Sequence, residues 1–349
     1  MISHRQFPAR PLNVAALLVL LCIAVPFVWA QDSEDTAINV SPAANARYTY
    51  SNFRSHILPA NTSAGKRALA SGSFRTAASN LQAQAAIAAV PSPGFYPSDL
   101  NYFGGPVVTN LLSHPLYINA SSCGGVASCW GNPERFLTDL GFSTFIHVTD
   151  QYTKTSGRYV LGQHVFASMR MFTNTVGQSE LLGAVHDAAA ALGTPGGYGN
   201  EFHIFLPKGV DTCFDQTSIC YSPDNPASFF FCAYHGSVTF SDIGHVLFSV
   251  EPFQNVTGCQ AGAPNPNGML ADSTNSVLSH ELIETITDPD GNAWIANNSL
   301  IASGAEIGDL CERGIPGKPF FDDPILLLNG RKYQLQLEYS NRFHACSPR

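Results

Sequence analysis

Eight cysteines beyond the first thirty residues constrain the fold of this chain more than any other feature. Their number is even and no Cys-x-x-Cys spacing occurs, which favours disulfides over a zinc cluster of thiolates. The local pairs Cys123–Cys129 and Cys213–Cys220 are the first expectation, with Cys311–Cys346 holding the C-terminal strand, although sequence leaves the connectivity open. We expect up to four disulfides from the eight: Cys123, Cys129, Cys213, Cys220, Cys232, Cys259, Cys311 and Cys346.

The N-terminus has the pattern of a secretory signal peptide. Residues 1–13 carry arginines and no acid, 15–25 are wholly apolar, and Val28 and Ala30 precede a cleavage site. The apolar run is short for a membrane of about 30 Å, and Pro26 interrupts it, which disfavours an anchor. We therefore expect cleavage after Ala30, a secreted location (extracellular or periplasmic), and no membrane association afterwards.

Low charge narrows the range of partners. Charged residues make up 13% of the chain, whose formal net charge is −8; the usual charged share is about 25%. Without a basic stripe, nucleic acids and anionic membranes are disfavoured as partners.

Composition divides the chain after the signal into two parts. Residues 31–93 are rich in Ala, Ser and Asn, with few large apolar side chains, and are expected to form a flexible or pro-like extension. Residues 94–349 are expected to form one globular domain.

Apolar periodicity within 94–349 predicts an α/β (α+β) fold, with a single mixed sheet layered against two main helices. In the C-terminal hairpin, Asn329-Gly330 is the turn, and the residues between Tyr333 and Tyr339 alternate to give one buried face, with Gln334, Gln336 and Glu338 on the other. Strands are expected at 105–109, 116–118, 144–148, 202–206, 229–234 and 245–250, helices at 132–140, 179–192 and 277–286, and the hairpin at 325–328 and 332–339.

The segment from His280 to Glu284 carries the most specific chemistry. On a helix, His280 and Glu284 rise from one face, and Glu281 points to the side of an ion held between them. This arrangement is that of the zincin His-Glu-x-x-His helix with Glu in the second ligand position, a ligand that zinc accepts. Glu306 or Asp309, one turn apart, would supply a third ligand or orient one, and His235 is a reserve candidate.

Two simpler interpretations stay open. In the first, the segment is an ordinary amphipathic helix. Its buried stripe would be Leu278, Leu282, Ile283 and Ile286, and its solvated face would be His280, Glu281, Glu284 and Asp288. The Asp288-Pro289-Asp290-Gly291-Asn292 segment would then be only a turn that ends the helix.

Several short segments occur together in a distinctive order. They are Ser279–Glu284, Thr287–Pro289, Asn292–Trp294 and Glu306–Cys311, with Gly104–Val107, Cys232–His235, Glu338–Asn341 and Cys346 around them. These landmarks resemble those of the EXORDIUM, or phosphate-induced protein, family, and the resemblance covers roughly Pro97 to Cys346. It implies an exported, wall- or matrix-associated protein, linked in plants to growth and carbon-status signalling. It also extends the metal hypothesis to His280, Glu281 and Glu284, and to Glu306 and Asp309.

Three functions follow from these observations. The first is a zinc-dependent hydrolase, a peptidase or amidase, in which Glu281 is the general base and His280, Glu284 and Glu306 or Asp309 hold the ion. The second is a non-enzymatic protein that binds cell-wall polysaccharide or a receptor. The third is a structural calcium site built from carboxylate oxygens.

Overall fold

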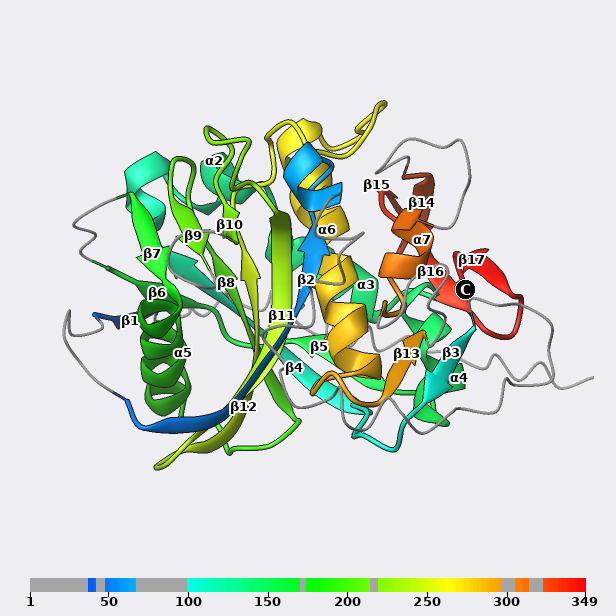
Figure 1. The fold of residues 1–349 in the computed structure, drawn as a ribbon, viewed down its shortest axis with the longest axis horizontal. Coiled ribbons are helices and arrows are strands. Elements are labelled where there is room, and N and C mark those ends of the chain that lie inside the picture. The colour runs from blue at the N-terminus through cyan, green and yellow to red at the C-terminus, as the bar shows by residue number, and fades with distance from the viewer. Residues whose placement is uncertain are drawn as a thin grey trace, which may run out of the picture. The chain divides into compact units, whose positions relative to one another are not determined.

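The main sheet is mixed and has eight strands (Figure 1). The computed structural model describes residues 37–41, 48–66, 99–169, 174–213, 219–296, 305–313 and 323–349. The strands from β1 to β12 in spatial order pair in parallel, whereas β11 is antiparallel to both of its neighbours. That order is β1 (Ile38–Val40), β6 (Val165–Ala167), β4 (Asn110–Ile118), β8 (Asn200–Phe205), β12 (Gly244–Glu251), β11 (Phe231–Phe240) and β2 (Tyr50–Pro59), and β5 (Arg158–Leu161) also pairs with β4.

Helices α5 (Gln178–Leu192) and α6 (Met269–Thr287) cover opposite faces of this sheet (Figure 1). Side chains alternate between the faces along a strand. On β8, Phe202 and Ile204 belong to the apolar core that contains α5, whereas Phe205 belongs to the core that contains α6. The predicted mixed sheet with two main helices is therefore confirmed.

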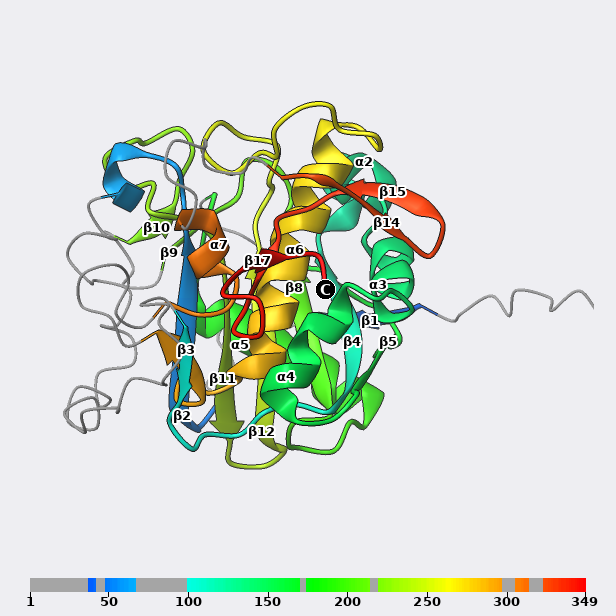
Figure 2. The ribbon, with the colours of Figure 1, turned by 90° about the vertical axis from the view of Figure 1, so that its right-hand side faces the viewer.

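Smaller elements surround α6, as Figure 2 shows for α3, α4 and the C-terminal strands. They form the wall of the second core, opposite the sheet. The helices are η3 (Ala120–Cys123), α2 (Val126–Trp130), α3 (Pro133–Gly141), η4 (Ile146–Thr149), α4 (Asp150–Thr153) and α7 (Asp309–Arg313); the paired strands are β3 (Leu100–Tyr102) with β13 (Trp294–Ala296), β14 (Ile325–Leu328) with β15 (Arg331–Gln334), and β16 (Glu338–Ser340) with β17 (Ala345–Ser347). A three-stranded sheet of β7 (Thr175–Gly177), β9 (Asp211–Cys213) and β10 (Cys220–Tyr221) belongs instead to the core that contains α5, through Val176 and Tyr221.

Four disulfides cross-link the described part of the chain. Three are the expected pairs, Cys123–Cys129, Cys213–Cys220 and Cys311–Cys346, and the fourth joins Cys232 to Cys259. Among the described residues, none of the helices combines the length and apolar character that crossing a bilayer requires.

The expectation of a loosely attached extension over 31–93 is wrong for two segments. Strand β1 pairs with β6, and β2 pairs with β11 over nearly its whole length. An edge strand needs few large apolar residues, because one neighbour satisfies its hydrogen bonds and a short run such as Ile57-Leu58 anchors it in the core. The predicted signal peptide, 1–30, lies outside the described residues, as do 67–93.

Three predictions of local structure are also wrong. Residues 105–109 are not a strand, because Val108 N–H donates to Ile286 O at the end of α6 rather than to a neighbouring strand. Residues 144–148 contribute to the 3₁₀ helix η4, since a short apolar run cannot distinguish a strand from a buried turn. Gln334, Gln336 and Glu338, which the alternation places on the face opposite the buried one, are themselves buried. The two glutamine side chains make hydrogen bonds within the protein, whereas neither oxygen of Glu338 has a hydrogen-bond partner.

Candidate metal centre

Helix α6 is buried on every side, although much of it is polar. His280, Glu281 and Glu284 each have 0% exposed surface. The solvated-face interpretation is therefore wrong, because this helix presents its ionisable side chains to the interior. The helix also begins at Met269, earlier than predicted, because the apolar periodicity in the sequence starts only at Val277. Asp288 does form the expected turn, because its Oδ1 accepts hydrogen bonds from two backbone N–H groups, those of Asn292 and Ala293.

Strand register aligns polar side chains across the sheet face that α6 covers. His56 of β2 lies opposite His235 of β11. His235 in turn lies opposite Ser249 of β12, which lies beside His203 of β8. Residues opposite one another in paired strands project to one face, and the contact of His235 with Glu284 identifies this face as the one beneath α6. The sheet thus places imidazoles directly against the carboxylates of the helix.

His235, Glu284 and Glu306 form the more deeply buried of two groups whose ligand atoms lie within 4.8 Å of one another. His235 Nε2 is 3.2 Å from Glu306 Oε2 and 3.5 Å from Glu284 Oε2. None of these three atoms makes a hydrogen bond of acceptable geometry. A tetrahedral zinc ion with bonds of about 2.0–2.2 Å separates its ligand atoms by about 3.3–3.6 Å. The distances and the missing hydrogen bonds both fit a shared cation.

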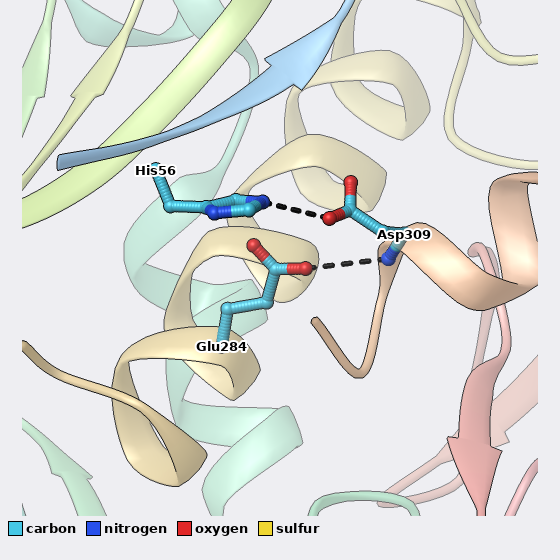
Figure 3. Close-up of side chains that lie close together, drawn as sticks. All are labelled: His56, Glu284 and Asp309. Atoms are coloured by element: carbon cyan, nitrogen blue, oxygen red, sulfur yellow. Dashed lines mark hydrogen bonds and ion pairs between the residues drawn. The ribbon is translucent and has the colours of Figure 1, made fainter. Parts of the chain in front are cut away.

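His56, Glu284 and Asp309 form the second group (Figure 3). His56 Nε2 is 2.7 Å from Asp309 Oδ2, and the backbone N–H of Asp309 donates to Glu284 Oε1 at 3.3 Å. Burial disfavours charge on His56, but Asp309 outweighs it and raises the pKa of the imidazole. The His56 side chain is 13% exposed, against 0–2% for the other ligand side chains.

His280 contacts Glu284 but belongs to neither group. Its Nε2 is 3.2 Å from Glu284 Oε1, and its Nδ1 is 3.0 Å from Gln336 Nε2, which also donates to Gly308 O at 2.7 Å. An amide N–H aimed at Nδ1 favours a ring proton on Nε2, which faces Glu284 without making a hydrogen bond of acceptable geometry. Burial opposes charge on the ring, but Glu284 and other nearby acids raise the pKa of His280. A cation bound among these acids would offset their negative charge, and the hydrogen bond from Gln336 would then determine which ring nitrogen carries the proton.

Glu281, the predicted general base, lies inside the same interior but outside both groups. Neither of its carboxylate oxygens has a hydrogen-bond partner. Burial raises its pKa well above the usual range; His280 opposes this rise, and the acids Glu284 and Glu251 add to it. Glu251 of β12 is itself buried, accepts a hydrogen bond from Ser249 Oγ at 2.8 Å, and has a pKa raised by burial to about 8.

Acids outnumber the bases that could neutralise them in this interior. No Lys or Arg side chain is buried among the described residues. Burial, with help from Asp288 and Glu284, raises the pKa of Glu306, and burial and the neighbouring imidazoles lower the pKa of His235 well below its usual value. A neutral imidazole is the form that ligates metals. Buried carboxylates without cationic partners are costly, so the composition of the site also fits a bound cation.

The sequence located part of this centre. It identified Glu284, Glu306 and Asp309 as candidate ligands and His235 as a reserve, and the structure brings all four near one another. It also assigned His280 as a ligand; the structure places His280 beside Glu284 but in neither of the two groups. It missed His56, whose segment was assigned to the extension; the apolar run after His56, Ile57-Leu58, was the available signal.

Comparison of the chain with protein-family models, with curated proteins and with solved structures found no match in any of the three. The resemblance to the EXORDIUM family therefore stays a prediction, and the site has to be interpreted from its own chemistry.

Proposed function

We propose that the protein is an exported, zinc-dependent hydrolase of the peptidase or amidase class, with His235, Glu284 and Glu306 as the ligands of its ion. The observation that carries the proposal is the set of three buried ligand atoms at 3.2 and 3.5 Å without hydrogen bonds. Because two carboxylates make the set rich in oxygen, manganese is the competing ion. The four disulfides and the predicted signal peptide support export.

The residues around the ion have distinct tasks in this proposal. A zinc ion held there would polarise a scissile carbonyl and acidify water. Glu281 would accept the proton from water, since both of its oxygens are free of hydrogen bonds; the positive charge of the ion would offset the burial that raises the pKa of this carboxyl and so favour its ionised form. His280 would hold Glu284 in place through Nε2. The substrate would approach from the side of His56, the partly exposed member of the two groups.

The test combines metal analysis with activity. Chelator-treated protein is dialysed against zinc or manganese, its metal content is measured by mass spectrometry, and hydrolysis of a peptide library is followed. We expect bound zinc in the native protein, loss of hydrolysis on chelation, and at least a 10-fold weaker affinity in His235→Ala and Glu284→Gln. His147→Ala is the matched control, because this histidine has a 41% exposed side chain, pairs with Asp150 and belongs to neither candidate group. A folded protein that binds neither ion would end the proposal.

A structural ion is the second candidate, and the burial of the ligands favours it. His235, Glu284 and Glu306 have side chains only 0–2% exposed, and closed coordination is typical of structural sites. In that case zinc would raise the melting temperature, Glu281→Gln would leave it unchanged, and no peptide would be cleaved under any metal loading. Cleavage that Glu281→Gln abolishes at full metal content would select the hydrolase.

A further inference from the structure

The two oxygens of Glu306 face two different histidines. Oε2 is 3.2 Å from His235 Nε2, and Oε1 is 3.1 Å from His56 Nδ1. The carboxylate is fully buried, yet neither oxygen makes a hydrogen bond of acceptable geometry. A single ion beside His235 accounts for one of these oxygens and leaves the other without a partner.

Glu284, like Glu306, lies between His235 on one side and His56 on the other, and it is a member of both groups. Its Oε2 is 3.5 Å from His235 Nε2, and the same side chain belongs to the group with His56 and Asp309 (Figure 3). The rings of His56 and His235 lie side by side across paired strands, with centroids 5.9 Å apart. Two imidazoles therefore flank two carboxylates, each of which can offer one oxygen to either side.

We propose that the site holds two divalent cations, bridged by Glu284 and Glu306. His235 would hold the first ion, which is the ion of the proposed function on which this inference rests. His56 and Asp309 would hold the second. Two-metal sites keep their ions about 3.5–4 Å apart, a spacing that bridging carboxylates impose. Two dications would also offset more of the buried negative charge than one.

The chemistry of the second position differs from that of the first. Asp309 adds a carboxylate, so this position is the richer in oxygen and would take manganese more readily than the first. His56 is also the most exposed ligand, with 13% of its side chain accessible, so the second ion would be lost first on dilution. The alternative is a plain ion pair, because His56 Nε2 and Asp309 Oδ2 at 2.7 Å also form a good charge-assisted hydrogen bond.

Metal stoichiometry decides between these arrangements. Chelator-treated protein is titrated with zinc in a calorimeter and with manganese in an electron paramagnetic resonance spectrometer. We expect two equivalents per chain, a manganese spectrum showing exchange coupling, and one equivalent in His56→Ala with a spectrum of isolated manganese. Asp309→Asn, which preserves the side-chain shape, should lower the affinity of the second equivalent at least 10-fold. His147→Ala should keep both.

The outcomes separate this inference from the proposed function. One equivalent in the native protein, abolished by His235→Ala and unchanged by His56→Ala and Asp309→Asn, would overturn the second ion and leave the first. No bound metal in the folded protein would overturn both.

Discussion

Gly308 shows how tightly single residues are fitted around the centre. A Cβ placed on it would lie 2.4 Å from Nδ1 of His280, and that ring is held by Gln336 on one side and Glu284 on the other. The absence of a side chain at this position is therefore a requirement of the site rather than of the backbone.

Gly308→Ala should destabilise the protein by about 1–3 kcal/mol, the usual cost of overpacking, and should weaken zinc binding because His280 and with it Glu284 must shift. Urea unfolding of the metal-free protein and zinc titration measure the two effects. Gly199→Ala is the matched control, since its Cβ would meet nothing within 4 Å. Equal stability and affinity of the two variants would contradict the steric argument.

Single residues also mark the limit of what the sequence could predict. The four-residue spacing of His280 and Glu284 placed both on one helical face, but it could not show that Glu284 belongs to both candidate groups and His280 to neither. That distinction depends on Gln336, which comes from a distant segment and donates to Gly308 O. His56 carries no local pattern, because its role arises only from its register opposite His235.

Among the elements, the β14–β15 hairpin is fixed to α3 by one carboxylate. Asp139 of α3 accepts hydrogen bonds from Asn329 Nδ2, Arg331 Nη1 and the Tyr333 hydroxyl at 2.6–2.9 Å. Burial alone would raise the pKa of Asp139, but the hydrogen bonds from Tyr333, Asn329 and Arg331 outweigh it and hold the pKa below its ordinary value. The Asn-Gly turn was predictable; this anchor was not, because it joins segments far apart in the sequence.

Asp139→Asn should lower the free energy of unfolding by about 1–3 kcal/mol at pH 6, since it weakens charge-assisted hydrogen bonds in a buried site. Because the folded pKa of Asp139 lies below the unfolded value near 3.9, the stabilisation is complete above about pH 4 and is lost as the pH falls through the folded value. Urea unfolding at a series of pH values should therefore show the gap between native protein and variant closing below about pH 4. A gap that stays constant would contradict the assignment.

Elements with a strong apolar period were the predictable ones. Helix α5 and strand β12 lie within one or two residues of their expected ranges. Helix α6 begins earlier than expected because its first turns bury Ser273, Thr274 and Asn275, and buried polar residues carry no apolar period. The alternation expected at Gln334 and Gln336 failed for the same reason: their side-chain amides make hydrogen bonds to other parts of the chain rather than to solvent.

At the scale of the whole molecule, the candidate centre depends on cross-links between distant parts of the chain. The Cys311–Cys346 disulfide ties α7, which begins at Asp309, to strand β17 across 35 positions. The Cys123–Cys129 disulfide closes a separation of only 6. The pairing of the cysteines was partly predictable from spacing, whereas the connection of one pair to the site was not.

Replacing Cys311 and Cys346 together by Ser should lower the free energy of unfolding by about 4 kcal/mol, and replacing Cys123 and Cys129 by about 2 kcal/mol, according to the loops that they close. The first change should also weaken zinc binding, because Asp309 and Glu306 lose their anchor, and the second should not. Guanidinium unfolding and zinc titration of both variants check these expectations. An equal loss of zinc affinity in both would contradict the link between the disulfide and the site.

The position of β2 at the sheet edge has a consequence for when this site comes into being. His56 and Asp309 are 253 positions apart, so the N-terminal strand leaves the ribosome long before its partners in β11, α6 and 305–309 exist. Contacts of such long range form slowly. Strand β2 can therefore pair only after β11, its neighbour in the sheet, has been synthesised. The buried cluster of histidines and acids is completed later still, when residues 305–309 have followed.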